Sequence, residues 1–221
     1  MRTVETRDPK SRRARAVTSE IGHLWANLLQ RGALRTSRTI GFCAIGEGER
    51  EGEVAANLAT FLGGRGMRVA LVEASLRDPI LAKVFGVPAA PGLDALLSGT
   101  VGLVGSLRRN VAPGVDLIPG TSAAEPFWGF TNERFRSCLQ ELLKDHDLCL
   151  VSVPVLVHAP EAALVIRALD GLVLATAANR HRTEIVRRHI AFLRALGTPL
   201  LGAVLTDVVH DLPAPFARWV G

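Results

Sequence analysis

The stretch that decides the fold runs from residue 39 to residue 59 and reads TIGFCAIGEGEREGEVAANLA. Its first six residues, 39–44, are apolar without alternation, which predicts a buried strand. Residues 46–52 form a loop of glycines and glutamates, and the run 53–62 predicts a helix that two glycines end. A glycine-rich loop between a strand and a helix commonly binds phosphate, because its N–H groups face the anion.

Working outward from this stretch, apolar runs alternate with helical patterns along the whole chain. Further strands are expected at 68–73, within 106–119, and at 148–153, 171–175 and 199–205. Helices are expected at 17–30, 78–85, 92–98, 132–144, 161–168 and 182–196, with a loop at 120–130. Because the strands are continuous apolar runs, helices should cover both faces of the sheet. The sequence therefore predicts a three-layer α/β/α fold with a mainly parallel sheet.

Charge is distributed unevenly along the 221 residues, whose net charge is +5. Residues 1–15 hold six basic and two acidic groups, so this segment carries +4 and the remainder only +1. We expect residues 1–16 to be a flexible basic arm and residues 17–221 to form one domain. The nearly neutral body makes nucleic acid an unlikely partner, because nucleic-acid binding depends on many phosphate contacts from basic side chains.

Composition also narrows the class of protein. No stretch reaches the roughly 20 uncharged apolar residues of a membrane-spanning helix, and the charged N-terminus has no apolar core typical of a secretory signal. The three cysteines, Cys43, Cys138 and Cys149, show no CxxC spacing. We therefore expect a cytoplasmic protein without a disulfide framework or a zinc site.

The glycine-rich loop lacks the side chains of a working phosphate-binding loop. Such a loop needs a lysine for the β- and γ-phosphates and then a serine or threonine for magnesium. Residues 46–53 contain neither, and instead hold four glutamates against the single Arg50. Like charges a few Å apart repel in a partly buried site. We expect this loop to repel a triphosphate.

Several stretches together resemble one family. They are VAANLA (54–59), SLRDP (75–79), FGVP (85–88), PGLDALLSG (91–99) and IPG (118–120). With these stretches, the chain from about residue 20 to residue 207 resembles the cytoplasmic ATPase domain of bacterial tyrosine kinases. These are the CpsD/CapB-type exopolysaccharide proteins, a branch of the MinD/ParA-like P-loop ATPases. The resemblance implies a P-loop NTPase-like fold.

The chain departs from this family at the positions that bind phosphate and magnesium. Aligned on residues 54–59, the family's Gly-Lys-Ser-Thr falls on Arg50, Glu51, Gly52 and Glu53. Glu51 thus replaces the lysine, and Gly52 replaces the hydroxyl that holds magnesium. Together with Gly46 and Gly48, these positions form a vestigial phosphate loop.

The acidic strand ends and the phosphate acceptor also differ. The family's Asp-Ala-Asp falls on Glu73, Ala74 and Ser75, and the aspartate of its later strand falls on Ser152. The family's adenine-side asparagine falls on Thr206, and the chain has no tyrosine to phosphorylate. Phosphoryl transfer depends on positioning and on charge neutralisation by lysine and magnesium. We therefore predict no catalytic residue, bound cofactor or metal.

The intact scaffold with altered chemistry leads to a hypothesis of function. We predict a catalytically inactive relative that regulates capsular or exopolysaccharide synthesis at the inner face of the cell membrane. The resemblance implies a polysaccharide co-polymerase or chain-length regulator as its partner, and an active sister kinase or a second copy as further partners. Candidate partner-binding residues are Glu20 and His23 in the family's oligomerisation helix, Phe127, Trp128, Arg180 and Arg187.

Two alternatives remain open from the sequence. The first is an ATP-binding tyrosine kinase with a rearranged site that uses Glu73 or Asp78. The second is a MinD/ParA-like adaptor that binds a membrane surface or nucleic acid through the basic arm and the 180–188 segment.

Overall fold

The computed structural model describes residues 9–30, 37–46, 48–122, 126–131, 133–156 and 159–207. These residues hold a seven-stranded sheet in the order β3-β4-β2-β5-β1-β6-β7. Neighbouring strands are parallel except β3 and β4, which are antiparallel. The strands are β1 (Thr39–Ala44), β2 (Val69–Glu73), β3 (Arg108–Ala112), β4 (Val115–Ile118), β5 (Leu148–Ser152), β6 (Gly171–Ala177) and β7 (Leu200–Thr206). The predicted fold class is confirmed.

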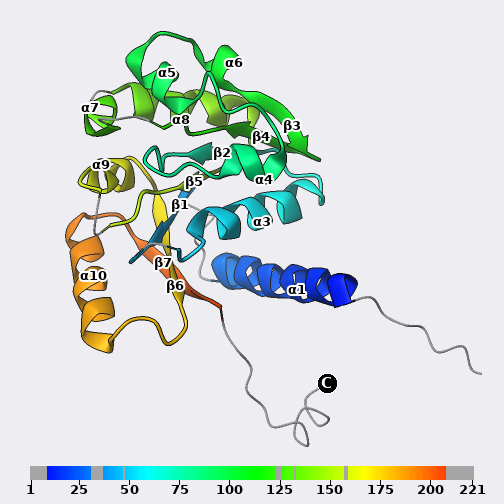
Figure 1. The fold of residues 1–221 in the computed structure, drawn as a ribbon, viewed down its shortest axis with the longest axis vertical. Coiled ribbons are helices and arrows are strands. Elements are labelled where there is room, and N and C mark those ends of the chain that lie inside the picture. The colour runs from blue at the N-terminus through cyan, green and yellow to red at the C-terminus, as the bar shows by residue number, and fades with distance from the viewer. Residues whose placement is uncertain are drawn as a thin grey trace, which may run out of the picture.

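Helices cover both faces of this sheet (Figure 1). One face packs against α1 (Pro9–Gln30), α3 (Glu51–Gly63) and α4 (Leu81–Phe85). The other face packs against α5 (Leu93–Ser98), α6 (Leu103–Ser106), α7 (Pro126–Phe130), α8 (Arg134–Asp145), α9 (Glu161–Arg167) and α10 (Thr183–Ala195). Within the described part of the chain, no helix is both long and apolar enough to cross a membrane.

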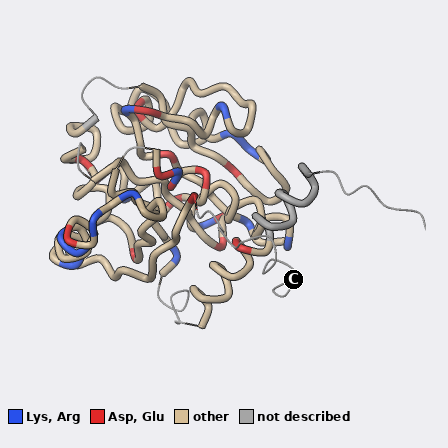
Figure 2. The backbone as a smooth tube through the Cα atoms, turned by 60° about the horizontal axis from the view of Figure 1, so that its bottom comes forward, with Lys and Arg blue, Asp and Glu red and all other residues tan. Residues whose placement is uncertain are grey.

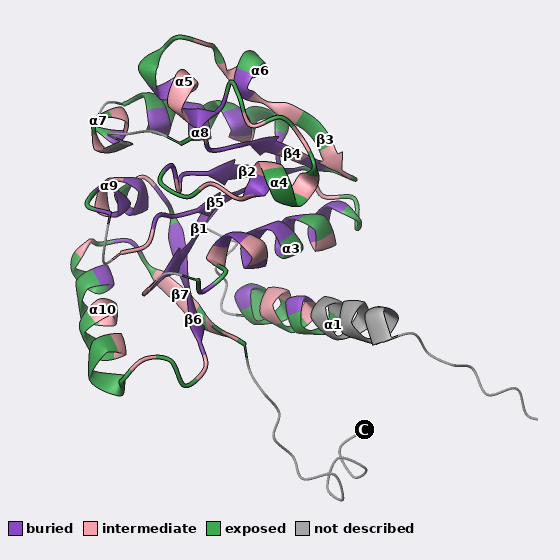
Figure 3. Cartoon of the chain, viewed as in Figure 1, coloured by how far each residue is buried: buried purple, intermediate pink, exposed green. Residues whose placement is uncertain are grey.

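The central strands contribute alternate side chains to two separate hydrophobic cores. In β2, Val69 and Leu71 lie in the core beneath α3, whereas Ala70 and Val72 lie in the core beneath α8. Figure 3 shows these strands buried throughout. Because both faces of each strand must be apolar, the strand sequences read as uninterrupted hydrophobic runs.

Six of the predicted helices begin at other residues than expected, and in α5, α8 and α10 the difference is one or two residues. Helix α1 begins at Pro9 rather than at residue 17, so it includes the second half of the predicted arm 1–16; residues 1–8 lie outside the described residues. Helix α3 begins at Glu51, because the Val54 N–H donates to the carbonyl oxygen of Arg50 at 3.0 Å. Helix α4 begins at Leu81 rather than at residue 78.

Two segments contain elements that the sequence did not predict. The expected loop at 120–130 is wrong for its second half, because residues 126–130 form α7. Proline suits the first position of a helix, since its missing N–H would have no helical partner. Phe130 anchors this short helix in the core and packs edge-to-face on Phe135, with ring centroids 5.2 Å apart. The segment 106–119 holds the antiparallel pair of β3 and β4 rather than one strand.

Candidate binding site at the carboxyl edge of the sheet

A cavity of about 440 Å³ lies at the carboxyl edge of the sheet, where open α/β folds bind ligands. Its walls come from the loop into α3 and its first turn, from the end of β2 and the following loop, and from the end of β5 and the following loop. The lining residues are Gly48, Arg50, Glu51, Glu53, Glu73, Ser75, Arg77, Asp78, Ile80, Ser152, Pro154, Val155 and Ala159.

Most of the vestigial positions predicted from sequence therefore face one cavity. Gly46 and Gly52 are the two exceptions, since neither lines it. Gly52 is buried directly behind the wall, where an added Cβ would lie 3.2 Å from Ser152 Oγ and 3.4 Å from Ile80 Cδ1. A hydroxyl side chain at position 52 would crowd both neighbours.

The loop into α3 is held from within by the buried carboxylate of Glu49. One oxygen, Oε2, accepts the backbone N–H groups of Ile45 at 2.7 Å and Gly46 at 3.0 Å. The other oxygen, Oε1, meets groups at the end of β6 and before α10: the backbone N–H of Ala177 at 3.2 Å, Thr176 Oγ1 at 3.3 Å and His181 Nε2 at 2.5 Å. Glu49 thus ties the loop after β1 to the loop after β6.

These hydrogen bonds favour the ionised form of Glu49. Burial alone would raise the pKa of this carboxyl, but the donors from Gly46, Ala177, His181 and Ile45 outweigh burial and hold its pKa below the usual range. The N–H groups of Ile45 and Gly46 therefore bind the protein's own carboxylate, which removes them as donors to a phosphate.

A second buried carboxylate, Glu73, also serves the backbone. Its Oε1 accepts the N–H groups of Ile80 at 2.6 Å and Leu81 at 2.8 Å, and its Oε2 accepts the N–H of Gly120 at 2.9 Å. The first two bonds cap α4, which explains why this helix begins at Leu81. Burial nevertheless raises the pKa of Glu73 above its usual value. Both oxygens have structural roles, which disfavours Glu73 as the centre of a rearranged catalytic site.

The Glu51 side chain lies in the first turn of α3 and lines the cavity. Burial raises its pKa to about 7, and the nearby charges of Glu49, Asp78 and Glu73 act in the same direction. No hydrogen bond to another side chain and no ion pair joins Glu51 to any described residue. At neutral pH this carboxyl is therefore poised between its charged and neutral forms.

The two arginines of the cavity are each paired with carboxylates. Arg77 donates to the fully buried Glu161 through Nε at 2.7 Å and through a terminal nitrogen at 3.2 Å. Arg50 lies 3.5 Å from Glu53 Oε1 and 3.5 Å from Asp207 Oδ1. Acidic side chains of the lining thus outnumber the basic ones, and Figure 2 shows acidic stretches gathered near the middle of the tube.

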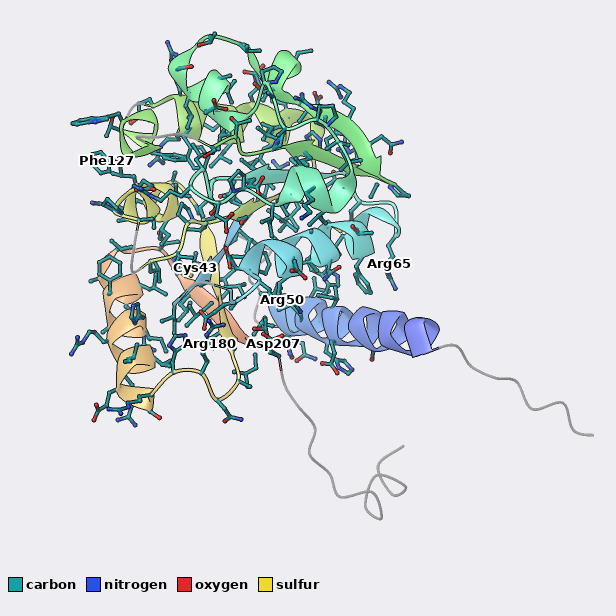
Figure 4. The ribbon with its side chains drawn as sticks, in the orientation of Figure 1. Cys43, Arg50, Arg65, Phe127, Arg180 and Asp207 are labelled. Atoms are coloured by element: carbon teal, nitrogen blue, oxygen red, sulfur yellow. The ribbon has the colours of Figure 1, made fainter. Side chains whose placement is uncertain are left out.

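The backbone of the loop keeps a left-handed turn at its end. Gly48 has φ +72° and Arg50, which precedes α3, has φ 62°. The Arg180 guanidinium lies against Gly48, with its nearest nitrogen 3.4 Å from the position of an added Cβ. Figure 4 shows Arg50, Arg180 and Asp207 in the same part of the molecule. Of the predicted partner-binding residues, Arg180 is the one that lies at the loop.

The other predicted partner-binding residues lie on different helices. Glu20 and His23 are exposed on α1, and Arg187 is exposed on α10, a helix whose basic positions cluster in Figure 2. Trp128 of α7 is 66% exposed and packs edge-on against Phe127 at 5.4 Å. Phe127 lies apart from Arg50 and Arg180 in Figure 4. These residues do not form one surface.

Sequence reasoning missed the groups that hold the site together. In the sequence, Glu49 is one of four similar glutamates of the loop, and His181 stands in no recognisable motif. The Arg77–Glu161 pair, 84 residues apart, carried no local signal. Neither Lys83 nor Lys144 lines the cavity. Among the described residues, no group of three or more His, Cys, Asp or Glu side chains is placed to hold a metal ion.

Comparison with known proteins identifies the relatives of the chain, although no family model matches it. It is 23% identical over 214 residues to the tyrosine-protein kinase CpsD of Streptococcus agalactiae. This match covers 96% of this chain and 91% of CpsD. It is 34% identical over 152 residues to the putative tyrosine-protein kinase EpsB of Ralstonia solanacearum, covering 68% of this chain. The match spans only 20% of EpsB.

A solved structure shows the same fold. The kinase domain of the Escherichia coli tyrosine kinase ETK superposes with a TM-score of 0.76 and 21% identity, over 80% of this chain and 70% of that domain. The similarity of sequence extends along nearly all of CpsD, and the similarity of fold covers most of this chain. In sequence the chain is therefore similar to bacterial tyrosine kinases of the CpsD and EpsB type, and it shares the fold of such a kinase domain.

Proposed function

We propose that this chain regulates capsular or exopolysaccharide synthesis by binding partners, and that it does not transfer phosphate itself. The observation that carries the proposal is Glu51. Alignment with the family puts Glu51 where the relatives have the lysine for phosphate, and its carboxyl lines the cavity with Glu53, Glu73 and Asp78. A triphosphate there would meet acidic side chains and no lysine among the described residues.

The residues for magnesium do not fit either. Gly52 offers no hydroxyl and has little room for one, and Ser152 replaces a carboxylate at the end of β5. Magnesium in phosphate sites is commonly held by one or two carboxylates together with the phosphates. Glu73 has both oxygens bonded to backbone N–H groups. The donor set therefore does not suit Mg-ATP.

Titration calorimetry with ATP and ADP, with and without magnesium, tests this proposal directly. We expect no heat of binding and no thermal stabilisation up to millimolar nucleotide. A matched variant with Arg50→Gly and Glu51→Lys restores the family's glycine and lysine without touching the crowded position 52, and it should bind nucleotide more tightly than the parent chain. Micromolar, magnesium-dependent binding to the parent chain would refute the proposal.

The partner role rests on the similarity to these kinases and needs its own test. We propose that the chain acts at the inner face of the membrane, on a polysaccharide co-polymerase or chain-length regulator, and that an active sister kinase joins the same assembly. Exposed residues on three helices, Glu20, Trp128 and Arg187 among them, supply separate surfaces for such contacts. Affinity purification from native membranes should recover a co-polymerase. Recovery of no membrane polysaccharide protein would contradict the partner role.

A further inference from the structure

The inner wall of the cavity carries a hydroxyl without a partner. Ser152, at the end of β5, is 2% exposed and lines the cavity. Its Oγ forms no hydrogen bond with any described residue and faces Gly52, where an added Cβ would be 3.2 Å away. The Ser152 residue is almost fully buried, yet its oxygen is not among the buried atoms that lack a partner, so it is accessible from the cavity. A ligand in the cavity can therefore hydrogen-bond to this hydroxyl.

The charge around this hydroxyl determines the kind of ligand. Glu51, Glu73 and Asp78 reach the cavity from α3, β2 and the following loop, and none of them forms an ion pair with a described residue. Arg50 and Arg77 are paired with other carboxylates. Glu73 is satisfied by three backbone N–H groups, so the acidic side chains left for a ligand are Glu51 and Asp78, beside the Ser152 hydroxyl.

The remaining wall is apolar. Ile80, Pro154, Val155 and Ala159 line the cavity beside the acidic groups. A bare metal ion would need several ligands at short distance, which the described residues do not bring together. An organic cation matches both parts, since its N–H groups can donate to carboxylates while its hydrocarbon chain contacts the apolar wall.

We propose that the cavity binds a small organic cation, whose ammonium or guanidinium group donates to Glu51 and Ser152 and whose aliphatic part packs on Ile80, Pro154 and Val155. This inference rests on the proposed function, because it requires that nucleotide does not occupy the cavity. The same chemistry exists in free polyamines and in basic side chains of a protein partner.

Binding of such a cation should depend on pH through Glu51. The charged groups around Glu51 are Glu49, Arg50 and Glu53 from the loop and α3, Glu73 from β2, and Arg77 and Asp78 from the next loop. The cation binds the ionised carboxylate, while burial and like charges favour the neutral form below about pH 7. Affinity should therefore increase up to about 20-fold from pH 5.5 to pH 7.5, with release of a proton on binding.

Calorimetry of the purified full chain with spermidine, with L-argininamide and with a short Lys/Arg peptide tests the inference. We expect binding of at least one of these cations at pH 7.5, and proton release detectable as a dependence of the heat on the buffer. Glu51→Gln should weaken binding at least tenfold and remove the pH dependence, and Ser152→Ala should weaken it several-fold. Glu141→Gln, at an exposed position of α8 outside the cavity, should leave binding unchanged.

The outcomes separate the two proposals. Binding of free cations identifies a small molecule, whereas binding of the peptide alone identifies a partner side chain, and both support the chemistry. No binding of any cation, or binding that Glu51→Gln leaves intact in a variant with native circular dichroism, would overturn this inference. If ATP also fails to bind, the proposed function stands without it, whereas ATP binding would refute the proposed function itself.

Discussion

Glu49→Ala is expected to lower the free energy of unfolding by about 4 kcal/mol at pH 7. The change leaves the N–H groups of Ile45, Gly46 and Ala177 without their acceptor in a buried setting. Each unsatisfied buried donor costs about 1–3 kcal/mol, and partial relaxation of the loop recovers some of this cost. His181 also loses its partner.

Urea denaturation followed by circular dichroism measures this effect. Glu141→Ala, at an exposed position of α8, is the control and should change stability by less than about 0.5 kcal/mol. Because the pKa of Glu49 is held below its usual range, its contribution is complete above the unfolded value near 4.5 and is lost as pH falls through the lower folded value. The difference between variant and parent should therefore shrink in strong acid. A loss below about 1 kcal/mol at pH 7 would show that Glu49 does not hold the loop.

Glu51→Gln, unlike Glu49→Ala, is expected to raise the free energy of unfolding, by about 3 kcal/mol at pH 8. The pKa of Glu51 rises from 4.5 to about 7 on folding, and each pKa unit corresponds to about 1.4 kcal/mol. A raised acid pKa means that the folded state binds the extra proton, so this group's contribution is fully present below pH 4.5 and is lost as pH rises through 7. Glutamine cannot ionise and avoids that loss.

Thermal unfolding at pH 5 and pH 8 tests this prediction. A gain of 3 kcal/mol corresponds to an increase in Tm of about 6–12 °C for a domain of this size, and at pH 5 the gain should be small. Glu53→Gln in the same helical turn is the matched control, since Glu53 pairs with Arg50 at 3.5 Å and should show no such gain at pH 8. An equal gain from Glu51→Gln at both pH values would mean that ionisation is not its cause.

The strands were the easiest part of the fold to predict from sequence. Each central strand is buried on both faces, so its signal is a short apolar run that needs no knowledge of its neighbours. The fold class followed from the alternation of these runs with helical patterns. The sequence did not predict α7, because five residues with one proline and a glycine carry little helical pattern. Tertiary contacts hold this helix in place, among them the packing of Phe130 on Phe135.

The position of the candidate site could be predicted from the sequence, but the hydrogen bonds that hold its loops together could not. A glycine-rich loop after the first strand identified the cavity wall, and the departures at Glu51, Gly52 and Ser152 could be read by alignment. The role of Glu49 could not, because its partners Ala177 and His181 lie 128 and 132 residues away. Only the parallel pairing of β1 with β6 brings their loops together. The opposite roles of two glutamates separated by a single residue thus come from tertiary structure.

The left-handed backbone at Arg50 has a consequence for how such a site can change over time. A residue other than glycine in this conformation costs about 1 kcal/mol, yet Arg50 adopts it with φ 62°, at the position onto which the resemblance places the family's glycine. The loop therefore takes its shape from its anchor at Glu49 and from α3, and not from its own conformational preference. A loop backbone that is fixed by contacts outside the loop tolerates substitution of its own side chains one at a time. Such a pocket can therefore change its ligand in evolution while every intermediate sequence still folds.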